Sequence, residues 1–324
     1  MRFLRNIYQT KSKTFENVIL LLSVTFLVLL IIVAILVGAA TTATVEIILL
    51  VRLPRVLGAI CAGAALSACG LILQNLMGNP LAGPNIIGVN SGAAFLTVVA
   101  ALLFPANPVI QPIFAFMGAF IVILSLYLLS SKSGISKMTI ILFGVAMNSL
   151  FNALTESVYT FFPNIIANHI SFKIGGLSAL NINTLAPASI IIIIVLVLAY
   201  FKTQQLEILS LGDDIAHSLG LSVRTMRLTF LVFSAALAGA SVSFSGIIGF
   251  IGLIVPHGAR LVIKSGTRKL YLTSVVWGST LLLFCDTLAR TVFKPFELPV
   301  GILLSLIGAP IFFGILFHTK GRGF

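Results

Sequence analysis

The chain has 324 residues, of which 59% are hydrophobic and only 9% are charged, and its mean hydropathy is +1.15. An ordinary soluble domain carries about 25% charged residues, so this composition excludes a soluble enzyme, a disulfide-rich secreted domain and a disordered protein. The net charge of +12 would suit nucleic acid only if the basic residues shared one face. They are instead scattered between apolar runs, so we expect no nucleic-acid partner and a polytopic membrane protein.

Ten apolar runs predict an all-α fold of about ten transmembrane helices in a single transmembrane domain over residues 1–324, because each crossing needs about 20 apolar residues. The first run is too long for a cleavable signal peptide and is predicted to be a retained span. In chain order the runs are 18–40, 57–77, 93–104, 110–129, 138–162, 187–201, 228–244, 247–263, 270–289 and 299–317.

The positive charges predict the orientation of the chain in the membrane. With both termini cytoplasmic, 15 of the 20 Lys and Arg residues fall in cytoplasmic segments. The remaining five are Arg52, Arg55, Lys173, Arg290 and Lys294. Positive charge is retained on the cytoplasmic side during insertion, so this bias favours a multi-pass protein of the plasma membrane with both ends inside.

Two spans carry matching stripes of small residues. Ala59, Gly63 and Ser67 recur every four residues in the second span, and Ala235, Gly239 and Ser243 do so in the seventh. Such stripes let helix backbones approach closely. Since the two spans run in opposite directions and each begins one half of the chain, they also suggest an inverted repeat of about four spans.

The longest polar interruption, residues 202–227, is predicted to be a structured cytoplasmic loop. Residues 211–219 can form a short amphipathic helix with Asp213 and Asp214 in its first turn, where acidic groups complement the helix dipole. Gly220 would end it, and Ser222 would cap a second short helix over 223–227. Two such helices would form a knob for a soluble partner, and a loop without a partner is the alternative.

A second irregular stretch, Asn79-Pro80-Leu81-Ala82-Gly83-Pro84-Asn85, cannot be a continuous helix because of its prolines and glycine. Irregular backbone at membrane depth is tolerated only where protein or a water-filled cavity surrounds it. The stretch therefore predicts an element that lines a pathway, or a plain re-entrant turn.

Ionisable residues in spans are candidates for function. Asp286 and Arg290 are one helical turn apart and can pair, whereas no basic residue lies one helical turn from Glu156 in the sequence, and His257 follows Pro256 in a broken span. No phosphate-binding loop, catalytic cluster or metal-ligand spacing is present in the sequence. We therefore expect no enzyme activity, no metal site and no cofactor on this chain, and an energy source outside it.

Five segments together resemble the FecCD-type permease subunits of iron-siderophore and cobalamin ABC importers. They are RLPRVLGAICAGAALSACGLILQ from Arg52, NPLAGPNIIGVNSGAAF from Asn79, LGDDIAHSLGLSV from Leu211, GFIGLIVPHGARL from Gly249 and ELPVGILLSLIGAPIFF from Glu297. The resemblance implies a ten-span permease that works with a second permease chain, identical or paralogous, two cytoplasmic ATPases that use ATP, and an extracytoplasmic substrate-binding protein.

The resemblance also implies roles for particular residues. The coupling contact with the ATPase would involve Leu211, Gly212, Asp213, Asp214, Ala216, Leu219 and Gly220, and the cytoplasmic gate Asn79, Pro80, Leu81 and Ala82. Arg52, Arg55 and Arg290 would receive carboxylates of the binding protein. The substrate it favours is an iron-siderophore complex, with cobalamin and heme as alternatives, and a secondary transporter or channel that works without ATP is the competing class.

Overall fold

The computed structural model describes residues 2–38, 44–105, 107, 110–130, 137–163, 174–178, 180–292 and 296–319. Lys173 and Lys294, two of the predicted outer charges, lie outside these residues. All the regular elements within them are helices. They are α1 (Arg2–Leu36), α2 (Val45–Ile47), the π-helix η1 (Ile48–Arg52), α3 (Leu53–Met77), α4 (Val89–Leu103), α5 (Ile110–Ser130), α6 (Lys137–Phe161), α8 (Ile182–Phe201), α9 (Thr203–Ser210), α10 (Asp213–Ser218), α11 (Val223–Ser245), α12 (Ile251–Val262), α13 (Thr267–Ala289) and α14 (Val300–Thr319).

Each of the ten predicted runs overlaps one helix, but the ten helices are not equivalent. Six helices in the described part of the chain are long and apolar enough to cross a membrane alone, α4, α12 and the 300–314 part of α14 are apolar but shorter, and α6, which contains several polar residues, belongs to neither group. The prediction of about ten full crossings is therefore too simple. The run predicted at 247–263 yields a helix of only 12 residues, since its first four residues form the irregular stretch 247–250.

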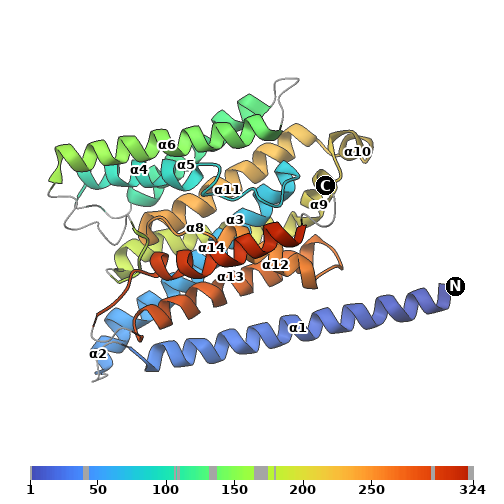
Figure 1. Cartoon of the computed structure of the whole chain (residues 1–324), viewed down its shortest axis with the longest axis horizontal. Coiled ribbons are helices and arrows are strands. Elements are labelled where there is room, and N and C mark those ends of the chain that lie inside the picture. The colour runs from blue at the N-terminus through green and yellow to red at the C-terminus, as the bar shows by residue number, and fades with distance from the viewer. Residues whose placement is uncertain are drawn as a thin grey trace.

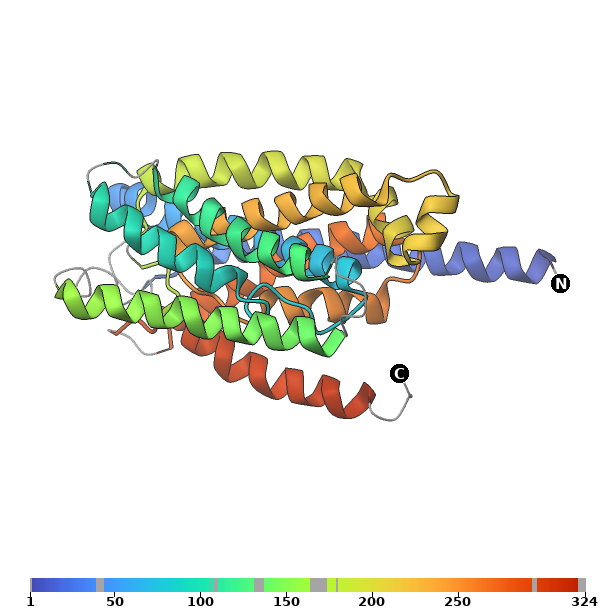
Figure 2. The ribbon, with the colours of Figure 1, turned by 90° about the horizontal axis from the view of Figure 1, so that it is seen from above.

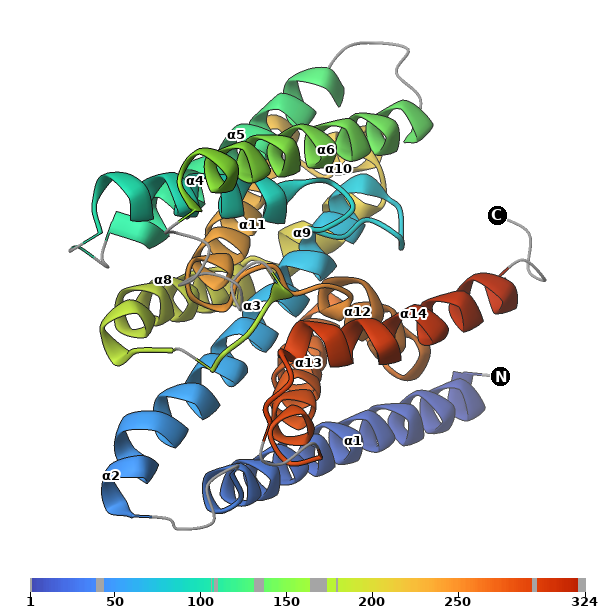
Figure 3. The same cartoon turned by 60° about the vertical axis from the view of Figure 1, so that its left-hand side comes forward.

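The long helices run side by side as one bundle, with α2 at one end and α10 at the other (Figure 1). We call these the α2 end and the α10 end. The central element is α3, which packs against α8, α11, α12 and α13. In contrast, α1 lies along the edge of the bundle and packs mainly on α13 (Figure 3). Seen from above, α6 and α14 lie along the same side of the bundle (Figure 2).

The helix contacts repeat in a way that supports the predicted inverted repeat. In the first half α3 packs on α13 and α4 on α5 and α6, and in the second half α11 packs on α5 and α12 on α13 and α14. Both predicted stripes lie at these contacts. A Cβ atom on Gly63 would be 2.3 Å from the carbonyl oxygen of Gly278, and one on Gly239 would be 2.7 Å from the Phe116 backbone.

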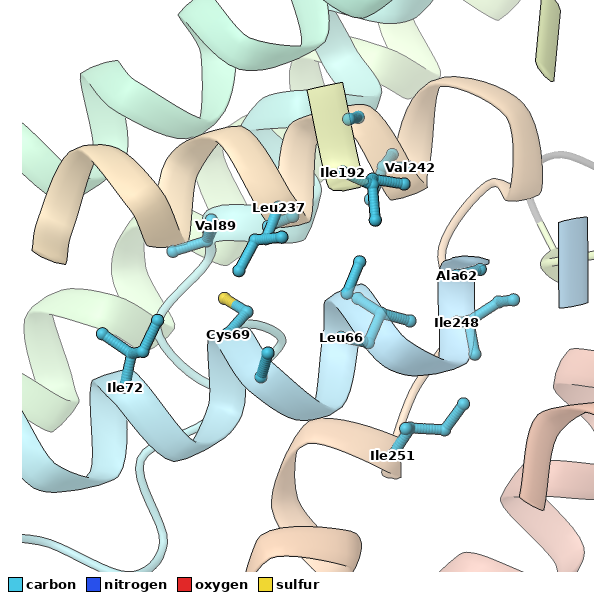
Figure 4. Packing of buried hydrophobic residues seen from close by; sticks show 14 of the residues in the cluster. Ala62, Leu66, Cys69, Ile72, Val89, Ile192, Leu237, Val242, Ile248 and Ile251 are labelled. Carbon is cyan, nitrogen blue, oxygen red and sulfur yellow. The ribbon is translucent and has the colours of Figure 1, made fainter. Parts of the chain in front are cut away.

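Two half-length helices begin against each other in the interior. The stretch 78–88 precedes α4 and the stretch 246–250 precedes α12, and Nδ2 of both Asn85 and Asn90 lies 3.4 Å from the carbonyl oxygen of Ile248. Gly88 and Phe250 have positive φ angles of 82° and 65° at these starts. Figure 4 shows the apolar packing around this point, where Cys69 on α3 faces Leu237 on α11.

Candidate functional site

A cavity of about 360 Å³ opens beside the predicted gate. Its walls come from the stretch before α4, the stretch before α12 and the α14 helix. They are formed by Gly83, Pro84, Asn85, Ile86, Ile248, Phe250, Gly252, Leu253, Ala309, Phe312 and Phe313. Asn85 is the single amide side chain among these apolar and aromatic residues, so the cavity offers a largely apolar surface next to irregular backbone.

The four predicted gate residues form a tight turn at the α10 end of α3. Gly78 ends α3 in a left-handed conformation with φ 55°, which a glycine adopts without strain. The Asn79 side chain then accepts a hydrogen bond from the Leu81 amide at 2.9 Å, and the Ala82 amide donates to the Asn79 carbonyl at 3.1 Å. The turn is thus built from local hydrogen bonds that leave the chain able to re-enter the bundle.

A polar clamp joins this turn to α12. Arg260 donates to the side chains of Gln74 and Asn75, the latter at 2.9 Å. Gln74 in turn donates to the carbonyl groups of Gly252 and Leu253, at 3.2 and 3.3 Å. Both ends of α12 are therefore fastened to the last turns of α3, directly before the turn formed by residues 79–82.

At the α2 end, buried charges form a network that connects α3, α13 and the segment before α14. Nε of Arg55 lies 3.0 Å from both oxygens of Asp286, and Nη1 of Arg55 lies 2.6 Å from Oε2 of Glu297. Arg290 is 3.7 Å from Asp286, which confirms the predicted pairing one helical turn apart. The Asp286 side chain is completely buried, whereas that of Glu297 is one-third exposed.

The three arginines predicted to dock a binding protein are all buried in this chain. Arg52 is 4%, Arg55 5% and Arg290 1% exposed. Arg52 donates to the carbonyl groups of Ile35 and Leu36 at 3.0 and 2.8 Å, and Arg290 donates to that of Ala34. Cations satisfy the free carbonyl groups at a helix C-terminus, so two of the arginines hold the end of α1. All three side chains already have partners within this chain. Docking of a binding protein on them stays a prediction.

The segment predicted to couple to an ATPase, residues 202–227, is called the coupling segment here, and it differs from its prediction in four respects. The first helix is shorter than 211–219, because Gly212, with φ 106°, precedes α10 and Leu219 follows it. The second predicted helix is wrong, since residues 223–227 are the first turns of α11. Ser222 stands at the cap position of α11 but makes no capping hydrogen bond with its side chain. A helix that was not predicted, α9, precedes the knob instead.

Other features of this segment match the sequence. Asp213 and Asp214 lie in the first turn of α10, and Gly220, with φ 79°, follows the end of that helix. Ala216 is completely buried. On the opposite side, Leu211, Ile215 and Leu219 are spaced four residues apart and are 55%, 49% and 61% exposed. The segment therefore presents a row of large apolar side chains to its surroundings.

Two polar contacts connect the coupling segment to the long helices. Nη2 of Arg227 lies 2.6 Å from Oδ1 of Asp213, which links α10 to α11. Oε2 of Glu207, on α9, accepts a hydrogen bond from the Thr267 amide at 3.2 Å, and a carboxylate at this first turn of α13 complements the helix dipole. The Glu207 contact joins groups 60 positions apart, and the sequence carried no signal for it.

The fold defines a class, that of polytopic helical membrane proteins, here with short helices that begin at irregular stretches and an exposed apolar row beside α10. Comparison with known proteins identifies the family. The model of the FecCD transport family matches residues 16–318, so the chain belongs to this family.

Among curated proteins, the hemin transport system permease protein HmuU of Yersinia pestis is 37% identical over 277 residues, which is 83% of each chain. The Fe(3+)-citrate import system permease protein YfmE of Bacillus subtilis is 36% identical over 269 residues, 82% of this chain and 80% of YfmE. A solved structure described as an inward-facing metal-chelate type ABC transporter has a TM-score of 0.81 and 29% identity, covering 93% of this chain and 99% of that one.

Proposed function

We propose that this chain is a permease subunit of an ABC importer that carries an iron-siderophore complex across the plasma membrane of a bacterium. It works with a second permease chain, two cytoplasmic ATPase subunits that bind and hydrolyse ATP, and an extracytoplasmic binding protein. The α10 end faces the cytoplasm, where both termini and the coupling segment lie. Family membership and relatives named for hemin and Fe(3+)-citrate transport support an iron-chelate substrate.

The observation that carries the proposal is the exposed apolar row formed by Ile215 on α10 and by Leu211 and Leu219 on either side of that helix. An apolar row at the α10 end, held in place by the Asp213–Arg227 ion pair, fits a cleft on a soluble partner. A secondary transporter has no need of such a knob. We therefore assign α10 as the element that contacts the ATPase and transmits its conformational change to the permease.

The test is a pair of variants in the coupling segment. Leu219→Asp places a charge in the apolar row, and Gly220→Pro replaces a residue whose φ of 79° proline cannot adopt. We expect iron-chelate uptake to fall at least tenfold while the amount of chain in the membrane is unchanged. Unchanged uptake in the double variant would exclude α10 as the coupling element. Parallel uptake of hemin and cobalamin distinguishes the alternative substrates.

A further inference from the structure

From Asn148 to Phe161 the exposed surface of α6 is divided lengthwise into a polar and an apolar flank. The side that packs on α4 and the stretch before it contains Gly144, Phe151, Thr155 and Tyr159. On the rest of residues 148–161 the polar side chains share one flank and the large apolar ones the other, with the exposed Ser157 between them, whereas before Asn148 the exposed Leu142 and Val145 lie on the side of the polar flank. The polar flank contains Asn148, Ser149, Asn152, Glu156 and Thr160, of which all but the half-buried Asn148 are exposed, and the apolar flank contains the exposed Leu150, Leu154 and Phe161.

The polar flank continues too deep into the membrane to be explained by the headgroup region. At 1.5 Å per residue, Glu156 lies about 8 Å and Asn148 about 20 Å from the Phe161 end of a helix about 37 Å long. Glu156 alone could reach the interface by snorkelling, but the amides of Asn148 and Asn152 could not. Polar groups at this depth face protein or a water-filled cavity, so the two flanks have different surroundings.

We propose that the polar flank of α6 lines the aqueous part of the translocation path, and that Glu156 makes the path selective for iron chelates with zero or positive net charge. This inference rests on the proposed function. The cavity beside the gate lies at the start of α4, which packs on α6, so the flank leads along the bundle toward that cavity. Across the described part of α6, Glu156 is the single acidic side chain.

A carboxylate in this position discriminates between iron chelates by charge. Three hydroxamate groups cancel the charge of Fe³⁺, and a protonated amine on such a chelator makes the complex cationic. Citrate and catecholate complexes of Fe³⁺ are anionic and would be repelled. For a group one helical turn away, at about 6 Å and an effective dielectric constant of about 40, Coulomb's law corresponds to roughly a tenfold change in occupancy per unit charge.

Cysteine labelling of the complete transporter in proteoliposomes tests the site without requiring transport. Asn152→Cys is expected to react with water-soluble methanethiosulfonates, and with a cationic reagent at least tenfold faster than with an anionic one after correction for their rates with a free thiol. In the Asn152→Cys/Glu156→Gln variant the two corrected rates should become equal. Leu154→Cys, on the apolar flank, is the matched control and should not react. The unsubstituted chain supplies the background from Cys61, Cys69 and Cys285.

Two results would overturn the inference. Asn152→Cys that is as unreactive as Leu154→Cys would place the polar flank outside any aqueous path, and a rate ratio unaffected by Glu156→Gln would remove the charge effect. Uptake provides the second readout, with a cationic ferric trihydroxamate expected to be preferred over ferric citrate and the preference reduced at least tenfold by Glu156→Gln, because the two chelates differ by two or more unit charges. If neither chelate is carried, the proposed function fails while the labelling result still decides the role of Glu156.

Discussion

Removal of the Asp286 carboxylate is expected to destabilise the chain strongly. Asp286 is completely buried, accepts two hydrogen bonds from Arg55 at 3.0 Å, and lies 3.7 Å from Arg290. Asp286→Ala would leave two buried guanidinium groups with only the carboxylate of Glu297. Breaking a buried ion pair in this way costs about 3–5 kcal/mol. At about 2–4 °C per kcal/mol, the unfolding midpoint should fall by roughly 6–20 °C.

Thermal unfolding of the purified protein in detergent measures this loss. The matched control is Glu297→Ala, because the Glu297 side chain is one-third exposed and Arg55 keeps both hydrogen bonds to Asp286 when it is removed. Its effect should stay at about 1 kcal/mol or less. A second variant, Asp286→Ala with Arg55→Met, removes one uncompensated charge and should recover part of the lost stability. An Asp286→Ala midpoint equal to that of Glu297→Ala would refute the electrostatic argument.

Two further predictions concern the close packing of α3 on α13 and the transmission of ATPase movement through the contact of Glu207 with Thr267. Gly63→Ala would place a Cβ atom 2.3 Å from the Gly278 oxygen and should lower stability by about 1–3 kcal/mol, whereas Gly314→Ala, which meets nothing within 4 Å, should leave the unfolding midpoint unchanged. Glu207→Gln weakens the hydrogen bond from the Thr267 amide but keeps an oxygen acceptor in place. ATP hydrolysis should continue while substrate uptake per ATP falls several-fold. An unchanged ratio of uptake to hydrolysis would show that this contact does not transmit ATPase movement to the long helices.

The sequence predicted the helices because apolar runs and their breaks are local signals. Each of the ten predicted runs overlaps one helix, and the prolines and glycines around Asn79 located the irregular turn that follows α3. The lengths and boundaries of the helices were less predictable from the sequence. The boundary drawn at Leu228 was wrong because residues 223–227 contain two arginines yet lack a helix breaker, so α11 already begins at Val223.

The buried charge network could not be predicted, because it depends on the packing of distant helices. Arg55 and Asp286 are 231 positions apart, and Arg55 and Glu297 are 242 apart. In the sequence, Arg55 was one of few arginines assigned to the outer side, which suggested an external partner. The structure provides an internal partner that no local pattern indicated. The sequence thus showed that Arg55 is an unusual charge, but only the folded structure shows that its partners are Asp286 and Glu297.

The half-length helices have a consequence for synthesis of the protein. With 15 and 12 residues, α4 and α12 extend about 22 Å and 18 Å, which is less than the apolar thickness of about 30 Å. Neither can be released into lipid as an independent span, since its irregular leading stretch would expose unpaired backbone groups to hydrocarbon. We expect each to remain with the insertion machinery until α5 or α13 has emerged behind it. The order of helices along the chain thus places a full-length helix directly after each short one.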